Sequence, residues 1–137
     1  MRYLLDTNIC VYWLRNKYGI SNKLKEVGLD NCAISEITMA ELKYGEEVAR
    51  RKGYLYKPQL LDELFLRIAV IPISEAIDFY AEEKARLRLA GLPNGDDFDL
   101  LIASTAVCND MTLVTENVKD FKNVEGLDIA NWVDRKM

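Results

Sequence analysis

Short apolar runs that end at polar residues recur along this chain, and segments with helical spacing of apolar residues separate them. Such runs are typical of buried strands, and strands separated by helices form a mostly parallel sheet covered on both faces. We therefore expect an α/β fold with a mostly parallel sheet of four to five strands flanked by helices, in a single domain over residues 1–137. The predicted strands are Tyr3–Leu5, Cys32–Ile34, Ala69–Ile71 and Thr112–Val114, with a short fifth near Asp128–Ile129.

Several helix starts carry a side chain that can accept hydrogen bonds from free backbone N–H groups. On this basis we place helix N-caps at Ser21, Ser35, Ser74 and Asp96. The helix after Ser74 is expected to end at Leu89, because a glycine and a proline follow it closely.

The charge balance and the absence of histidine exclude several classes of function. With 18 basic and 22 acidic side chains the net charge is −4, which excludes binding of nucleic acid by overall positive charge but leaves room for a local basic strip. Without histidine there is no His general base, no Ser-His-Asp triad and no zinc site that uses His. Three well-separated cysteines indicate reduced thiols and a cytoplasmic protein. We expect no signal peptide and no membrane segment, because no apolar run is long enough.

Three acidic residues lie at a strand end or on a helix face that also carries apolar residues. Asp6 ends the first strand, Glu41 lies on an apolar helix stripe, and Asp99 lies near the start of a late helix. Each has a structural explanation: a helix cap for Asp6, a solvated surface for Glu41 and a capping-box partner of Asp96 for Asp99. Asp120 lies just beyond the fourth strand and is otherwise a surface residue.

Together these acids point to a metal-dependent reaction on a phosphodiester. Carboxylates that converge on one pocket repel each other unless a cation holds them. A ligand set of oxygens alone favours Mg²⁺, or Mn²⁺, over zinc. Such a cation can activate water and neutralise charge on a phosphate, which the carboxylates alone would repel.

Four stretches, in order and over nearly the whole chain, resemble the successive motifs of PIN-domain ribonucleases. The resemblance is closest to the VapC-type toxins of prokaryotic toxin–antitoxin pairs. One stretch alone is not specific, but four in order at suitable spacing are. They are Leu4–Asn8, Ile37–Gly45, Asp99–Ala103, and Leu113–Asn117 with Asp120–Phe121.

This resemblance implies a Mg²⁺-dependent endoribonuclease that cuts structured RNA such as tRNA or rRNA and forms a homodimer inhibited by a cognate antitoxin. Asp6 and Asp99 match the family's metal-binding aspartates, and Glu41 matches a motif glutamate that also faces the metal. Asn117 and Asp120 match the last motif. Some relatives carry Asp in place of Asn117, so this chain has one charge fewer for a second metal.

RNA binding by an acidic protein requires local cations. The candidates are Arg50, Arg51 and Lys52 on one helix, and Lys84 and Arg88 on another, with a solvated, salt-bridged helix face as the structural alternative. Aromatic residues that could stack on bases, or pack in the core or a dimer interface, are Tyr12, Trp13 and Tyr44.

Two other functions are weighed against the ribonuclease. A haloacid-dehalogenase-like phosphatase would use an Asp after the first strand, but its D-x-D-x-T/V signature fails at Asn8 and Cys10. A catalytically weak PIN fold that binds proteins remains open. Surplus apolar helix surface near Ile9–Leu14 and Leu60–Phe65 favours a homodimer, and a groove lined by Ile9, Tyr12 and Trp13 is expected to receive an antitoxin helix.

Overall fold

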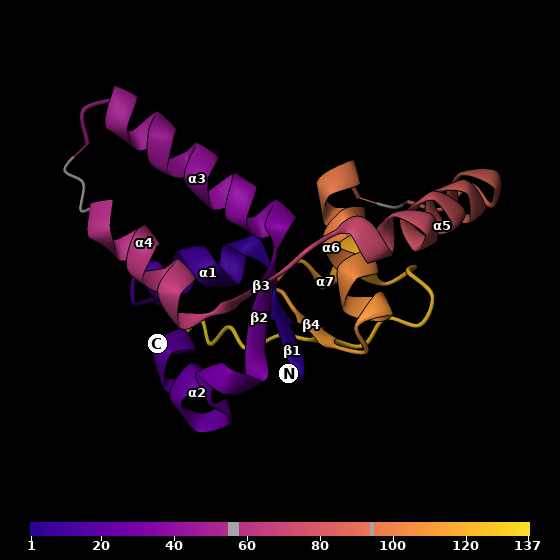
Figure 1. Ribbon diagram of the computed structural model, residues 1–137. Coiled ribbons are helices and arrows are strands. Elements are labelled where there is room, and N and C mark those ends of the chain that lie inside the picture. The colour runs from indigo at the N-terminus through magenta and orange to yellow at the C-terminus, as the bar shows by residue number, and fades with distance from the viewer. Residues whose placement is uncertain (55–57, 94) are drawn as a thin grey trace.

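Five short strands form one parallel sheet in the computed structural model, which describes residues 1–54, 58–93 and 95–137 (Figure 1). Every neighbouring pair of strands is parallel, and the order is β3-β2-β1-β4-β5. This arrangement confirms the predicted α/β class and adds the fifth strand to the same sheet. The strands are β1 Tyr3–Leu5, β2 Cys32–Ser35, β3 Ala69–Ile71, β4 Thr112–Val114 and β5 Ile129–Ala130.

Helices lie on both sides of this sheet. In Figure 1, α3 and α4 lie to the left of the strands, and α5 and α6 lie to the right. Within the described ranges, none of the helices has the length and apolar character needed to cross a membrane. The helices are α1 Thr7–Leu14, α2 Ile20–Val27, α3 Glu36–Arg51, α4 Pro58–Arg67, α5 Ile77–Leu89, α6 Asp97–Cys108 and α7 Val118–Phe121, with short 3₁₀ turns at Leu29–Asn31 and Ser74–Ala76.

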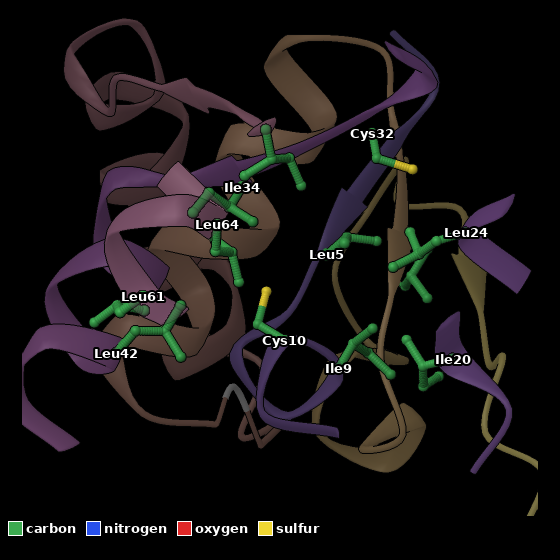
Figure 2. Close-up of a cluster of buried hydrophobic side chains, with 12 residues drawn as sticks. Leu5, Ile9, Cys10, Ile20, Leu24, Cys32, Ile34, Leu42, Leu61 and Leu64 are labelled. Atoms are coloured by element: carbon green, nitrogen blue, oxygen red, sulfur yellow. The ribbon is translucent and has the colours of Figure 1, made fainter. Parts of the chain in front are cut away.

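Two apolar clusters cover the two faces of the sheet because successive side chains of a strand point in opposite directions. Leu5 of β1 belongs to the cluster with α1, α2, α3 and α4, part of which Figure 2 shows. Leu4 belongs to the other cluster, with α5, α6 and α7. Both side chains are fully buried. The uninterrupted apolar sequence of β1 is therefore that of a central strand between two helical layers.

Two of the predicted caps are confirmed and two are wrong. Ser35 accepts a hydrogen bond from the backbone N–H of Ile37, and Asp96 accepts one from that of Asp99. Helix α2, however, begins at Ile20 after a left-handed Gly19, so Ser21 lies inside its first turn. Ser74 lies in a 3₁₀ turn before α5, which begins only at Ile77.

Candidate active site

Asp6 lies at the carboxyl end of the central strand β1. The chain adds β2 and β3 on one side of β1 and β4 and β5 on the other, so the direction of strand addition changes at β1. In parallel sheets, side chains that bind ligands collect at such an edge. Asp6 is 3% exposed, and its carboxylate accepts hydrogen bonds from the Thr7 N–H (2.8 Å) and the Thr115 hydroxyl (2.7 Å). Burial raises the pKa of Asp6, and these two hydrogen bonds offset that rise only in part. Asp6 therefore caps α1, as its structural explanation requires, and also faces the other acids.

Glu41 faces Asp6 from α3. Its Oε1 accepts a 2.7 Å hydrogen bond from the Thr7 hydroxyl, which lies 3.1 Å from the hydroxyl oxygen of Thr38. Glu41 is half-buried, and burial raises the pKa of its carboxyl, with the negative charges of Asp6 and Asp96 adding to the rise. A solvated surface position is therefore the wrong description of Glu41.

Asp99 is the acid whose ionisation its surroundings oppose most clearly. Burial, together with the neighbouring negative charges of Asp96, Asp6, Glu41 and Asp120, raises its pKa to about 7. Gly95 approaches it closely: a Cβ on Gly95, which has φ +68°, would lie 3.3 Å from Oδ2 of Asp99. The turn before α6 thus needs glycine both for its backbone and for the space beside this carboxylate.

The last motif supplies a more exposed part of the site. Asp120 is exposed on α7, and its charge contributes to the raised pKa of Asp6 and of Asp99. Asn117 precedes α7, is exposed, and donates its backbone N–H to Thr115 Oγ1 at 3.0 Å. The charge of Asp120 therefore acts on Asp6 and Asp99. Asn117 lies beside Thr115, the residue that donates a hydrogen bond to Asp6.

In the part of the chain that the structure describes, no Lys or Arg neutralises these acids. The ion pairs that are present include none of Asp6, Glu41, Asp96, Asp99 and Asp120. In the same residues, no three acidic or cysteine side chains converge closely enough to enclose an ion as they stand. The donors are carboxylate and amide oxygens, and their chemistry fits a hard divalent cation.

A groove of about 520 Å³ extends from these acids along α1, between α3 and α4. Its lining includes Thr7 and Glu41 of the acidic site. It also includes Glu46, whose Oε2 is buried and accepts no hydrogen bond from the described residues. The other side chains are mainly apolar, and the lining contains Val11, Leu14, Arg15, Leu42, Gly45, Leu60 and Leu61.

The predicted lining of this groove by Ile9, Tyr12 and Trp13 is wrong. Ile9 is fully buried in the apolar cluster that Figure 2 shows. Tyr12 donates its hydroxyl to Glu116 at 2.6 Å, and Trp13 lines a different cavity. Helical rotation instead turns Val11 and Leu14 towards the groove.

Most of the cations expected to bind RNA are paired with acids. Arg50 and Arg51 lie 3.1 Å from Glu47, and Lys84 lies 2.6 Å from Asp97. Lys52 lies over the ring of Tyr54, and the described residues place no acid beside Lys52 or Arg88. The salt-bridged alternative thus describes Arg50, Arg51 and Lys84. Of the aromatic candidates, Tyr12 and Trp13 pack against the core, whereas Tyr44 is 73% exposed.

Sequence reasoning missed the threonines that hold the acids in place. Thr7 contacts both Asp6 and Glu41, and Thr115 contacts Asp6. Their positions beside the motif acids are a signal, but their partners become visible only when β1, β4 and α3 meet. Asp96, which the sequence indicates only as a helix N-cap, also adds negative charge to the group of acids around Asp99.

The sequence of this chain is similar to a known protein family and to characterised members of it. The PIN domain family model matches residues 3–127. Ribonuclease VapC2 of Rickettsia felis is 41% identical over 96% of this chain and 98% of its own length. The tRNA(fMet)-specific endonuclease VapC of Shigella flexneri is 30% identical over the same shares.

Solved structures agree with these sequence matches. A chain in the crystal structure of VapBC2 from Rickettsia felis, bound to a DNA fragment from its promoter, superimposes with a TM-score of 0.83 and 37% identity. The alignment covers 96% of this chain and 99% of that one. A chain of the DNA-bound VapBC from Salmonella typhimurium also gives a TM-score of 0.83, at 26% identity.

Proposed function

Because this chain belongs to the PIN-domain family and is similar to VapC ribonucleases over nearly its full length, we propose that it is a Mg²⁺-dependent endoribonuclease toxin that cuts structured RNA such as tRNA or rRNA. The observation that carries the proposal is the gathering of acids around Asp6 and Asp99, without a Lys or Arg paired to them among the described residues, and the raised pKa of each of these two aspartates. Carboxylates that lie near one another repel, and a bound divalent cation would relieve that repulsion.

Asp6 and Asp99 are the proposed metal ligands, and Glu41, Asn117 and Asp120 are further candidates. The cation supplies an activated water and neutralises charge on the phosphodiester. The fixed orientation of Asp6 comes from Thr7 and Thr115, so this carboxylate binds without first being ordered.

Glu41 has a different part in the proposal. Its Oε1 is held by Thr7, while its Oε2 accepts no hydrogen bond from the described residues. Oε2 is therefore available to orient water or to bind the cation. Because Glu41 lines the groove as well as the acidic site, RNA that lies in the groove reaches this oxygen.

The proposed partner is a cognate antitoxin. Its tail would insert an Arg or Lys among the acids, where charge-assisted hydrogen bonds compete with Mg²⁺, and lay an apolar helix face in the groove along α1. The groove supports this proposal because apolar side chains such as Leu14 and Leu61 share it with the acids Glu41 and Glu46. Replacing the inserted basic residue by Ala should restore some cleavage while the complex stays assembled.

We also propose a homodimer that acts in the cytoplasm. Leu66 and Leu89 are 87% and 88% exposed, which is apolar surface that a second copy could cover. Sedimentation as a monomer at micromolar concentration would contradict the dimer. The three cysteines are free thiols, consistent with a reducing compartment.

The proposed function is tested by expressing the chain in a bacterium with and without the antitoxin encoded beside it, and by mapping new RNA ends. Growth arrest with new ends at defined tRNA or rRNA sites is expected only without the antitoxin. Asp99→Asn should abolish both, while the exposed α4 variant Asp62→Asn should not. Arrest by Asp99→Asn without new RNA ends would instead favour a protein-binding PIN fold.

A further inference from the structure

We propose that RNA is held by a basic strip at the far end of α1, made of Arg15, Lys17, Lys25 and Arg67, which binds the phosphates flanking the cleaved one. This inference rests on the proposed function, since it assigns the substrate-binding surface of the same enzyme. It replaces the cations at Arg50, Arg51 and Lys84 that the sequence suggests.

The cations of the strip differ from Arg50, Arg51 and Lys84 because they have no acidic partners. Among the described residues, no carboxylate lies within 4.0 Å of a nitrogen of Arg15, Lys17, Lys25 or Arg67. All four side chains are exposed. The unneutralised Lys25 and Arg67 line one cavity, so they give a local positive potential that attracts phosphates, in a protein with a net charge of −4.

A cavity of about 420 Å³ lies within the strip. Helices α1, α2 and α4 meet around it, and Lys25 and Arg67 line it together with the polar side chains of Asn16 and Ser21. The ring of Trp13 forms another wall, and the guanidinium of Arg67 lies 5.6 Å from its centroid. The cavity therefore offers two cations, an amide and a hydroxyl, which are the groups that commonly bind phosphate and ribose oxygens.

Helix α1 connects the strip to the acids. Asp6 caps its first turn and Arg15 caps its last, and eight helical residues span roughly 12 Å. Arg15 and Thr7 line the same groove. In this proposal, an RNA strand with one phosphate at Asp6 and Asp99 follows the groove to Arg15. The next residue, Asn16, lines the cavity at Lys25 and Arg67.

Cations at helix ends also complement the helix dipole, and Arg15, Lys25 and Arg67 lie near the ends of α1, α2 and α4. The helix-dipole role explains the sign of the charges. It does not explain the cavity that Lys25 and Arg67 line, or the groove that extends from Arg15 to the acids. An acidic protein segment would match the charges too. RNA is the ligand that accounts for both the strip and its connection to the cleavage site.

The test compares two double variants in an Asp99→Asn background, which prevents cleavage. Lys25→Gln with Arg67→Gln removes charge from the strip, and Arg50→Gln with Arg51→Gln removes the competing, acid-paired cations. Binding of total bacterial tRNA is measured between about 50 and 200 mM salt. Circular dichroism checks that each variant is folded, and Arg67→Lys tests whether charge alone restores binding.

We expect the Lys25/Arg67 variant to raise the Kd about tenfold and to reduce the salt dependence, d log K/d log [salt], by about 1.4 to 2 in magnitude. The Arg50/Arg51 variant should change Kd by less than about twofold. Unchanged binding in the Lys25/Arg67 variant, or an equal loss in the Arg50/Arg51 variant, would overturn the inference. Weakened antitoxin binding with unchanged tRNA binding would overturn it in favour of a protein ligand.

Failure of the proposed function remains distinguishable from failure of this inference. The chain with Asp99 intact is assayed separately for cleavage of the same tRNA. If it binds tRNA through the strip but cleaves none, the ribonuclease assignment is contradicted and the strip stands. If it cleaves tRNA but the strip variants bind normally, the strip alone is contradicted.

Discussion

The hydroxyl of Thr115 donates a 2.7 Å hydrogen bond to Oδ2 of Asp6, although the two residues lie 109 positions apart. The bond joins the ends of β1 and β4, neighbouring central strands whose pairing continues through the Asp6 N–H to the Val114 carbonyl at 2.9 Å. Asp6, the catalytic candidate of the first motif, is thus oriented by Thr115 of the last motif.

Thr115→Val should destabilise the protein, because it removes the hydroxyl at nearly constant volume and leaves a buried carboxylate oxygen poorly satisfied. We expect the free energy of unfolding to fall by about 1–3 kcal/mol, measured by urea unfolding. Thr112→Val, at the start of β4, the strand that Thr115 follows, is the matched control, because the described residues show no hydrogen bond for the Thr112 hydroxyl. Equal stability of the two variants would contradict the role of Thr115.

Thr7→Val should reduce RNA cleavage mainly through kcat, because it frees Glu41 to rotate while the groove keeps its shape. The expected loss is about tenfold or more, and Thr7→Ser should restore most of the activity because it returns the donor. A loss that Thr7→Ser fails to rescue, or one confined to KM, would show that Thr7 does not position Glu41.

Asp99→Asn should stabilise the metal-free protein at alkaline pH. The pKa of Asp99 is about 7 in the folded state against an ordinary 3.8, so its stabilising neutral form is lost as pH rises through 7. In EDTA, the variant should gain about 1–2 kcal/mol over the parent near pH 8, and less near pH 5.

Magnesium should narrow this stability difference, because the ion stabilises the parent more than the variant. Thermal unfolding with and without Mg²⁺ measures the change, and Asp62→Asn serves as the control. A pH-independent difference between Asp99→Asn and the parent would contradict the electrostatic account of Asp99.

Glu83→Ala should be strongly destabilising although Glu83 belongs to a charged helix. Its side chain is 4% exposed and accepts hydrogen bonds from Arg86 (2.6 and 2.8 Å) and from the Glu125 N–H (2.6 Å). Its loss should lower the free energy of unfolding by about 2–3 kcal/mol at neutral pH, whereas the exposed neighbour Glu82→Ala should have little effect.

The pH dependence of the Glu83→Ala effect has a defined sign. The hydrogen bond with Arg86 lowers the pKa of Glu83, so its contribution is present at neutral pH and is lost as pH falls through the lowered pKa. The gap between parent and variant should therefore close below about pH 4. A constant gap across this range would contradict the ionic origin of the stabilisation.

Local sequence patterns predicted those features that depend on local chemistry. The strands Ala69–Ile71 and Thr112–Val114 have the predicted bounds, and the caps at Ser35 and Asp96 depend on residues two or three positions away. Ser74 failed as a cap because a 3₁₀ turn separates it from α5. Such a turn has no strong sequence signal.

The sequence predicted the acids of the candidate site, but it did not predict the residues that hydrogen-bond to them. Asp6, Glu41 and Asp99 carry motif and periodicity signals, whereas the bond from Thr115 to Asp6 exists only after β4 pairs with β1. The same limit applies to cations. The sequence makes Lys84 a candidate for RNA binding, but Lys84 pairs with Asp97 of another helix, α6, and no local pattern indicates this contact.

The central claim is that the acids around Asp6 and Asp99 cleave RNA when they hold a divalent cation. The most direct measurement is cleavage of total bacterial tRNA by the purified chain as Mg²⁺ is titrated, compared with Asp6→Asn and Asp99→Asn. We predict no cleavage in EDTA, saturable activation by Mg²⁺ in the parent, and at least a hundredfold loss in both folded variants, on the order expected when a catalytic charge is removed. Full activity in EDTA, or in a folded Asp99→Asn protein, would contradict the claim.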